Sequence, residues 1–361
     1  MKTVKKIELL APAKDKEVGK EAILHGADAV YIGIEGFSAR STAGNSIDDI
    51  AELVGFAHLF NARVYVALNT ILYKDELPKV ERLIWNLYRI NVDALIVQDM
   101  GILQLNLPPI PLHASTQTDN RTAEKVKFLE SAGFSQVVLA RELSIGDIAE
   151  IASQVSVPLE VFIHGSLCVS YSGQCYLSEA VTGRSANRGE CAQMCRLPYD
   201  LEDANGSIIK KDTHLLSLKD FNQYDNLEEL LEAGVSSLKI EGRLKGISYV
   251  KNVVSVYRQK LDKIFEKKPQ YMRSSSGTSR IDFKPDLSKS FNRGFTDYFS
   301  HGRQQNIWSF DSPKSLGEYI GTIKSTGRNN LTFNTKHVLH NGDGLCFMDR
   351  NGLNGFRINR V

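Results

Sequence analysis

Short runs of apolar, often β-branched residues alternate with amphipathic stretches through the first 240 residues of the chain. Apolar residues are consecutive in most of these runs, which is typical of strands buried on both faces of a parallel sheet. We therefore predict eight strands, over residues 7–12, 29–34, 63–70, 94–98, 111–115, 136–140, 159–164 and 237–241. The amphipathic stretches predict helices over residues 15–25, 47–60, 77–90 and 145–154.

Strands separated by helices indicate parallel βα units, and eight such units within residues 1–250 predict an α/β fold of the (β/α)8, TIM-like barrel type. A doubly wound open sheet is the alternative. That fold usually carries a glycine-rich phosphate loop after its first strand, whereas the segment here reads Ala-Pro-Ala-Lys-Asp. The pattern therefore favours the barrel.

The pattern changes after residue 250. Residues 251–268 predict a long basic helix, and residues 269–290 are polar and rich in serine, so 251–314 is expected to form a basic helix and a linker. Residues 315–361 hold short apolar runs separated by glycine and asparagine, which predicts a small antiparallel β-module. Because about four strands leave open edges, we expect this module to be incomplete.

Composition narrows the functional classes. Hydrophobic residues make up 42% and charged residues 24% of the chain, as in a folded globular protein. No apolar run reaches the ~20 residues of a membrane-spanning helix. The short apolar stretch near the start is interrupted by Pro12 and Lys14, unlike a secretory signal. We therefore expect a cytoplasmic protein without a membrane partner.

Charge is divided unevenly along the chain. Residues 1–250 carry 25 basic and 33 acidic side chains, whereas residues 251–361 carry 19 basic and 9 acidic ones. A basic flank of this kind is suited to contact with a polyanion. A solvated surface helix around 251–268 is the alternative interpretation.

Four of the five cysteines lie within 28 residues, in a segment (164–198) that follows the seventh predicted strand. They are Cys168, Cys175, Cys191 and Cys195, separated by six, 15 and three residues. Structural zinc prefers ligand pairs with two to four residues between them, so the first pair is too wide. Four thiolates at irregular spacing favour a [4Fe–4S] cluster, with zinc and unliganded thiols as alternatives. Cys346, in the β-module, is expected to be a small buried hydrophobic residue.

The cysteine segment leaves the carboxyl end of a barrel strand, where barrel enzymes carry their chemistry. Polar residues on and after the seventh and eighth strands are candidate catalytic groups: Glu160, His164, Lys239, Glu241 and Arg243. Lys239 and Glu241 alternate along one strand, so we expect them to face the barrel interior and to pair. His164 suits either a proton donor or a hydrogen-bonded core residue.

Two arginines inside the cysteine segment, Arg184 and Arg188, are candidate partners of a bound cluster. A cubane with four thiolates carries negative charge, which nearby cations stabilise. Solvation of a surface loop is the alternative role for these side chains.

A longer pattern spans the seventh strand and the first two cysteines. It reads Glu160-x-Phe162-x-x-Gly165-Ser166-Leu167-Cys168 and, after four residues, Gly173-x-Cys175-x-Leu177-Ser178. This pattern resembles the signature of the collagenase-like peptidases of unassigned catalytic type, family U number 32. Further matching segments are ELLAPA near the start, HASTQ at 113–117, NRGEC at 187–191, SLKIEGR at 237–243 and FNRGFT at 291–296. The run GRSANRGECAQMCRLPYDL most resembles the branch that contains bacterial 23S ribosomal RNA 5-hydroxycytidine synthases.

The resemblance implies an oxygen-independent RNA hydroxylase that acts on the C5 position of a pyrimidine. The implied substrate is 23S ribosomal RNA or its precursor, with tRNA 5-hydroxyuridine synthesis as the related alternative. It also implies a [4Fe–4S] cluster on Cys168, Cys175, Cys191 and Cys195, and it implicates prephenate as a co-substrate. The ribosomal RNA branch is usually much longer than 361 residues, so a missing C-terminal part would bear on RNA docking.

The family name implies a competing function, proteolysis. A cysteine protease needs a thiolate paired with an oriented histidine, and His164 lies close to Cys168 in the sequence. However, a nucleophilic cysteine does not need three cysteine companions, and the sequence has no HExxH motif. A non-catalytic iron–sulfur scaffold that binds a partner protein is a third possibility. The sequence therefore favours the hydroxylase, with a Cys168/His164 peptidase as the alternative.

Overall fold

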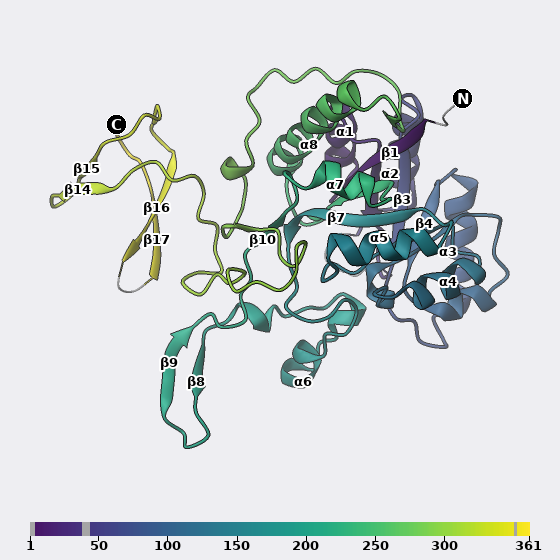
Figure 1. Ribbon diagram of the computed structural model, residues 1–361, viewed down its shortest axis with the longest axis horizontal. Coiled ribbons are helices and arrows are strands. Elements are labelled where there is room, and N and C mark those ends of the chain that lie inside the picture. Colours follow the sequence, from purple (N-terminus) through teal and green to yellow (C-terminus); the bar gives the residue numbers. More distant parts are fainter. Residues whose placement is uncertain (1–3, 38–43, 350–351) are drawn as a thin grey trace.

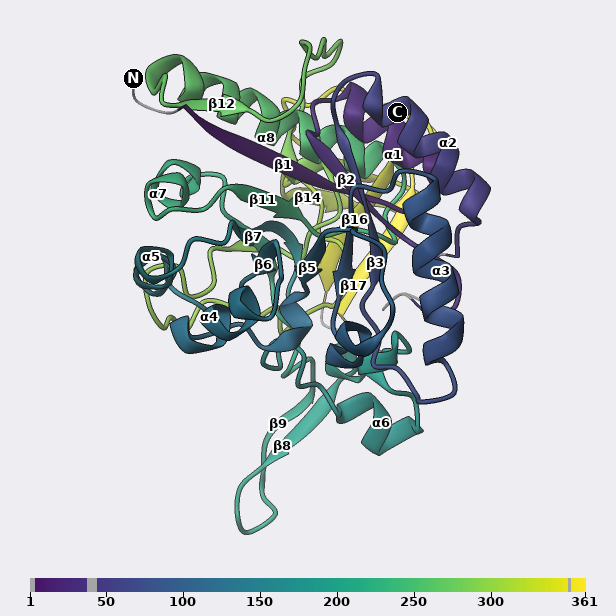
Figure 2. The ribbon, with the colours of Figure 1, turned by 90° about the vertical axis from the view of Figure 1, so that its right-hand side faces the viewer.

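The computed structural model describes residues 4–37, 44–349 and 352–361. Within these residues, eight parallel strands form a closed barrel in which each strand pairs with the next and the last pairs with the first (Figure 1, Figure 2). The strands are β1 (Lys5–Ala13), β2 (Ala29–Gly33), β3 (Arg63–Leu68), β4 (Ala94–Val97), β5 (Leu112–Ala114), β6 (Gln136–Val138), β7 (Leu159–Ser166) and β11 (Ser237–Ile240). All eight predicted strands and the TIM-like barrel are confirmed.

Most of the helices cover the outside of the barrel between successive strands. The α-helices of the described residues are α1 (Lys16–Leu24), α2 (Ile47–His58), α3 (Leu77–Arg89), α4 (Ala123–Ser131), α5 (Ile145–Gln154), α6 (Leu177–Thr182), α7 (Leu227–Glu232) and α8 (Ile247–Lys267). The short 3-10 helices are η1 (Met100–Gln104), η2 (Thr116–Thr118), η3 (Ala186–Arg188), η4 (Met194–Arg196) and η5 (Leu287–Lys289). Side chains of Asp15, Ser46, Thr122 and Ser144 accept backbone N–H groups and so begin α1, α2, α4 and α5.

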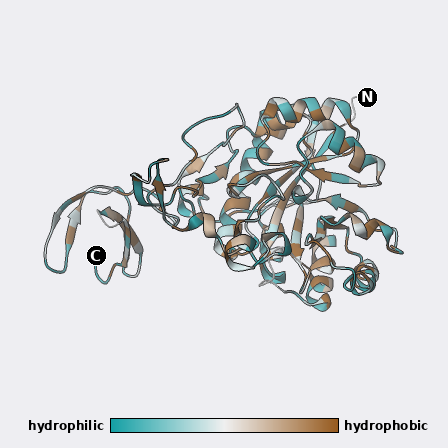
Figure 3. Cartoon of the chain, turned by 90° about the horizontal axis from the view of Figure 1, so that it is seen from below, coloured by the Kyte–Doolittle hydropathy of each residue, from teal (hydrophilic) through white to brown (hydrophobic). Residues whose placement is uncertain are grey.

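Several strands lie outside the barrel ring. β10 (Asp220–Asn222) runs antiparallel to β7 and pairs with β13 (Phe295–Thr296). β8 (Tyr199–Glu202) and β9 (Ile208–Thr213) form a hairpin that projects from the barrel (Figure 1). The C-terminal residues form two antiparallel hairpins, set apart from the barrel in Figure 3: β14 (Ile323–Thr326) with β15 (Leu331–Phe333), and β16 (Gly344–Asp349) with β17 (Gly352–Arg357).

The expectation that Cys346 is buried is wrong. Cys346 lies on β16 and is exposed, and its Sγ contacts the backbone oxygen of Leu316 at 3.3 Å. A two-stranded hairpin has no second layer to cover both of its faces, so an apolar residue within it stays accessible.

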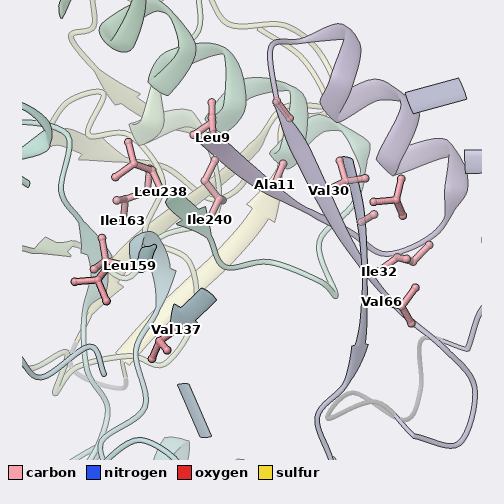
Figure 4. Packing of buried hydrophobic residues seen from close by; sticks show 14 of the residues in the cluster. Leu9, Ala11, Val30, Ile32, Val66, Val137, Leu159, Ile163, Leu238 and Ile240 are labelled. Carbon is pink, nitrogen blue, oxygen red and sulfur yellow. The ribbon is translucent and has the colours of Figure 1, made fainter. Parts of the chain in front are cut away.

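The hydrophobic core lies mainly between the barrel strands and the helices. Outward-pointing strand residues such as Leu9, Ile32 and Val137 belong to this core (Figure 4). Alternate strand residues point into the barrel, where Leu10 and Tyr65 belong to a smaller cluster. No helix of the described residues is long and apolar enough to cross a membrane.

The predicted basic helix is the eighth helix of the barrel. α8 buries Val250, Val253 and Val254 and packs on β1 and α1. Its Arg258 is also buried and pairs with Asp28 at 3.2 Å. The expected boundary at residue 250 therefore falls inside α8, because the apolar face of the helix decides where it packs, whatever the charge of its other face. Beyond α8, β12 (Tyr271–Arg273) pairs with β1, so the predicted linker begins by rejoining the barrel.

Candidate active site at the barrel mouth

A cavity of about 200 Å³ lies at the carboxyl end of the barrel strands. Residues that follow four strands line it: Asn69 after β3, Ser115 and Gln117 after β5, Arg141 and Glu142 after β6, and Glu241 and Arg243 after β11. The segment between β7 and β10 contributes Cys168, Cys175 and Cys191. This is the end at which TIM-barrel enzymes carry their active sites.

Two glycines allow the cysteine segment to fold against the barrel. Gly165 and Gly173 both have positive φ, 109° and 75°. A Cβ on Gly165 would lie 2.7 Å from the backbone oxygen of Glu241, and a Cβ on Gly173 would lie 2.0 Å from that of Gln117. Because no larger residue fits at these distances, both positions require glycine. The segment is therefore in direct contact with the residues that follow β11 and β5.

The four cysteines of this segment are free thiols that influence one another. A hydrogen bond with the Cys175 thiol lowers the pKa of Cys168 to about 5 and raises the pKa of Cys175. Burial raises the pKa of Cys195; the Arg196 guanidinium opposes this effect, and charges on Cys168 and Cys191 add to it. Cys168 and Cys175 thus interact directly, and the charges of Cys168 and Cys191 act on Cys195.

Two arginines place positive charge beside these sulfurs. Arg141 donates to the backbone oxygen of Ser166 at 2.9 Å and pairs with Glu241 at 3.2 Å. After the Cys175 hydrogen bond, its charge contributes to the lowered pKa of Cys168. Among the described side chains, Arg141 Nε is a buried donor without a hydrogen-bond partner. Arg196 donates to the backbone oxygen of Leu167 at 2.7 Å, next to Cys168 in the chain.

Of the two arginines proposed from the sequence as cluster partners, Arg188 has a carboxylate partner outside the cysteine segment. Arg188 pairs with Glu76 at 2.7 Å and donates to the backbone oxygen of Ile71 at 2.6 Å. It thereby ties the cysteine segment to the residues that precede α3. Arg184 is exposed. The arginine charges that act on the cysteines are those of Arg141, on Cys168, and Arg196, on Cys195.

Lys239 and Glu241 do not pair with each other as expected. Lys239 Nζ lies 2.6 Å from Glu160 Oε1, and Glu241 pairs with Arg141. The expectation is wrong because β11 ends at Ile240, so Glu241 has left the strand on which alternation applies. Lys239 still reaches the cavity, whereas Glu160 lies below it and accepts a second hydrogen bond from Gln136 at 2.6 Å.

His164 is buried beside helix α8. Its Nδ1 lies 3.3 Å from the hydroxyl of Tyr257, and its ring packs against Tyr249 and Phe295. Burial lowers the pKa of His164 to about 3, so the ring is neutral near pH 7. Of the described residues, neither His164 nor Glu160 lines the cavity, whereas Lys239, Glu241 and Arg243 do.

A polar layer inside the barrel was not predicted from the sequence. Glu8 accepts hydrogen bonds from Tyr65 at 2.5 Å and from Ser237 at 2.8 Å. Burial raises the pKa of Glu8 to about 7, and the charge on Glu160 adds to this effect. His113, also buried, has its pKa lowered to about 3, mainly by burial. A carboxylate and an imidazole within otherwise apolar strand runs are the signal that could have revealed this layer.

The fold and this site define a TIM-barrel protein whose mouth carries three free cysteines, Cys168, Cys175 and Cys191, beside arginine, lysine and glutamate side chains. Residues 14–309 match Peptidase family U32, and the chain belongs to that family. The resemblance noted in the sequence is thereby confirmed.

Three relatives illustrate the range of the family. The chain is 54% identical over 356 residues to the 23S rRNA 5-hydroxycytidine C2501 synthase of Escherichia coli strain K12. The matched region covers 99% of this chain and 54% of that protein. It is 34% identical to tRNA hydroxylation protein P1 of Bacillus subtilis strain 168, over 95% of this chain and 83% of that protein. It is 30% identical to a collagenase of Porphyromonas gingivalis strain W83, over 98% of this chain and 84% of that protein. The chain therefore spans about half the length of the first relative.

Proposed function

We propose that this protein is an iron–sulfur-dependent, oxygen-independent hydroxylase of the C5 position of an RNA pyrimidine, of the 23S ribosomal RNA cytidine type. The observation that carries the proposal is 54% identity, over 99% of the chain, to a 23S rRNA 5-hydroxycytidine synthase. The cysteine-lined cavity at the barrel mouth supports it. An RNA substrate places this activity in the cytoplasm.

The proposed cofactor is a [4Fe–4S] cluster held by Cys168, Cys175, Cys191 and Cys195. Among the residues that the structure describes, no three His, Cys, Asp or Glu side chains are arranged to bind one metal ion. A zinc ion draws four ligands to about 2.0–2.3 Å from one point, whereas a cubane binds each thiolate at a different iron atom. The cysteines are separated by six, 15 and three residues and so lack the two close ligand pairs of a structural zinc site, which favours the cluster. When bound, the cluster supplies redox chemistry at the mouth of the barrel.

Prephenate, a dicarboxylate, is the proposed co-substrate. Among the described residues, three cations line the cavity, Arg141, Lys239 and Arg243. The Nε of Arg141 is a buried donor that no described side chain or backbone atom uses. Guanidinium groups bind carboxylates through paired hydrogen bonds, and Lys239 adds a point charge. These groups would orient a small anion beside the cysteines and exclude water from it.

Amide side chains in the lining of the same cavity suit a pyrimidine base. Asn69 donates to Gln117, whose Nε2 in turn donates to Gln98 at 3.1 Å. Amides carry both a donor and an acceptor, so they can match the hydrogen-bonding edge of a base that has left its stack. Asn69 and Gln117 both line the cavity.

Proteolysis by Cys168 and His164 is the second candidate, favoured by the lowered pKa of Cys168 and by the collagenase relative. In the described residues, however, His164 hydrogen-bonds to Tyr257, and Cys168 contacts Ser170 at 3.0 Å. A histidine with a pKa near 3 is also a poor base for a thiol. The geometry therefore supports the hydroxylase better.

The test is nucleoside analysis of a strain that lacks the gene. We expect 5-hydroxycytidine to disappear from purified 23S ribosomal RNA and to return with the intact gene but not with a Cys168→Ala variant. Loss from tRNA alone would reassign the substrate to the tRNA branch. Unchanged nucleosides in both RNAs, together with gelatin cleavage that requires Cys168 and His164, would overturn the proposal in favour of a peptidase.

A further inference from the structure

A second cavity, of about 550 Å³, adjoins the cysteine cavity. Tyr298 lines both cavities, and Val169, the residue after Cys168, lines the second. We call this second cavity the aromatic groove, after the aromatic residues of its lining: Tyr298, Phe299, Trp308 and Phe310. A chain that lies in the groove is therefore next to the candidate active site.

The rings of the groove form two stacked pairs. The centroids of Tyr298 and Phe299 are 3.8 Å apart with planes within 20° of parallel. Those of Trp308 and Phe310 are 5.9 Å apart with planes within 8°. Trp308 and Phe310 are only partly buried, so they retain surface for a ligand. Tyr298 and Phe299 are buried, so Trp308 and Phe310 are the rings of the groove that a base can reach. Accessible aromatic rings are the surfaces on which nucleobases stack in single-strand binding proteins.

Cations accompany these rings. The guanidinium of the exposed Arg303 lies 4.5 Å from the Phe299 centroid, and Lys210 of β9 lies 5.0 Å from that of Phe310. The described lining of the groove contains no Asp or Glu, and Gln304 and Gln305 add amide groups. The groove thus complements a chain that carries negative charge between flat, polar rings.

The junction between the two cavities is held in an unusual conformation. Tyr298 has φ of 58°, in the left-handed region that bulky side chains rarely adopt. Its backbone N–H donates to Thr296 Oγ1 at 2.9 Å, and its backbone oxygen accepts from Gln304. Strained residues of this kind cluster at binding and active sites, where surrounding contacts hold them in place.

We propose that the aromatic groove binds single-stranded RNA, that its rings stack the nucleotides beside the target, and that the target base enters the cysteine cavity past Tyr298. The inference rests on the proposed function, because an enzyme that modifies a base must first take it out of its stack. Proline-rich peptides also dock in aromatic grooves. Such a peptide has no negative charge to match Arg303 and Lys210, so the cations favour RNA.

The two tryptophans of the chain make the groove directly observable. Trp85, on α3, donates to the backbone oxygen of Asn106 and does not line the groove, whereas Trp308 does. In the Trp85→Phe variant of the full chain, a 12-nucleotide single-stranded RNA should quench the emission of Trp308 to saturation. The Trp308→Phe variant keeps a ring, so it should bind the same RNA with similar affinity and show no quenching.

Two further variants measure the contribution of stacking and charge by fluorescence anisotropy of labelled RNA. Trp308→Leu should weaken binding by roughly 5- to 100-fold, the loss of one stacked base. Arg303→Ala should reduce the magnitude of the slope of log affinity against log salt by about 1, the contribution of one phosphate contact. Phe128→Leu on α4 and Arg82→Ala on α3 remove an exposed ring and an exposed cation elsewhere and should change neither quantity.

RNA that binds by anisotropy without changing Trp308 emission would overturn the groove proposal and leave the proposed function standing. Quenching by a proline-rich peptide in place of RNA would assign the groove to a peptide and overturn it as well. Trp308 quenching by RNA, combined with unchanged nucleosides in the strain without the gene, would contradict the proposed function while supporting the groove.

Discussion

Lys239 and Glu160 form a buried ion pair directly beneath the cysteine cavity, with Nζ and Oε1 2.6 Å apart and side chains 5% and 0% exposed. Glu160 is held in turn by Gln136 and Ser237, at 2.6 and 3.4 Å. The ammonium also lies 4.5 Å from the Tyr31 ring centroid. Lys239 is therefore held at the floor of the cavity by Glu160, which does not line the cavity, and by Tyr31, which does.

The first prediction concerns this pair. Glu160→Gln leaves the Lys239 ammonium buried without its counter-charge, so we expect the free energy of unfolding to fall by about 3–5 kcal/mol. Adding Lys239→Met should restore most of that stability, because the two changes together remove both charges. Urea denaturation of the two single variants and the double variant measures the coupling.

The hydroxylase activity of the same variants distinguishes a role of Lys239 in positioning a ligand from a role in stabilising the fold. If Lys239 acts on a ligand in the cavity, the stable double variant should still form no hydroxylated pyrimidine. A double variant with full activity would show that the pair serves the fold alone.

The second prediction concerns the cysteines. Protein purified without oxygen should be brown and hold about four iron atoms per chain. Replacing any one of Cys168, Cys175, Cys191 or Cys195 by Ala should lower the iron content sharply and abolish activity, since all four thiolates share one cofactor. Cys346→Ala is the matched control and should change neither, because it lies on the C-terminal hairpin. A colourless protein with one zinc per chain would contradict the cluster.

The third prediction concerns the approach of the cysteine segment to the barrel. A Cβ at Gly173 would lie 2.0 Å from the backbone oxygen of Gln117, so Gly173→Ala should displace the segment and prevent iron incorporation. Gly183 also has positive φ, 71°, but open space around its Cβ position. Gly183→Ala should therefore cost only about 1 kcal/mol of backbone strain and retain iron. Equal iron content in the two variants would rule out the proposed role of the close contact.

The fourth prediction follows from Glu8. Its folded-state pKa of about 7 lies above the value of 4.5 for an unperturbed glutamate, because burial disfavours the charged form. Between these two values the folded protein binds more protons than the unfolded chain, so this group makes stability fall as the pH rises. The full effect amounts to about 3 kcal/mol, present below pH 4.5 and lost as the pH passes through 7.

Glu8→Gln removes this titration while keeping a side chain that can bond with Tyr65 and Ser237. Denaturation midpoints measured from pH 4 to 8 should therefore decline less with pH in the variant than in the parent. Parallel curves for the two proteins would show that Glu8 keeps an ordinary pKa in the barrel.

The sequence alone was sufficient to predict the eight strands of the barrel and most of its helices, and to single out the four clustered cysteines. Strands such as 63–70 and 159–164 could be predicted because a run of consecutive apolar, often β-branched residues is a local property of the sequence. The spacing of Cys168, Cys175, Cys191 and Cys195 pointed to a shared site without any knowledge of the chain path. Helix α4 was not predicted, because its apolar face consists of little more than Ala123, Val126 and Leu129.

Tertiary structure decided which charges meet. Lys239 pairs with a residue 79 positions away, and Arg188 pairs with a residue 112 positions away. Local alternation could not reveal either contact, because the partner depends on which strands become neighbours when the barrel closes. The same closure made the basic helix α8 a part of the barrel, and folding of the distant segments around Val169 and Trp308 created the aromatic groove. Patterns within about ten residues therefore determined most elements, and the spacing of four cysteines within 28 residues defined the cysteine set. Packing between distant segments determined the pairing of charges and the shape of the cavities.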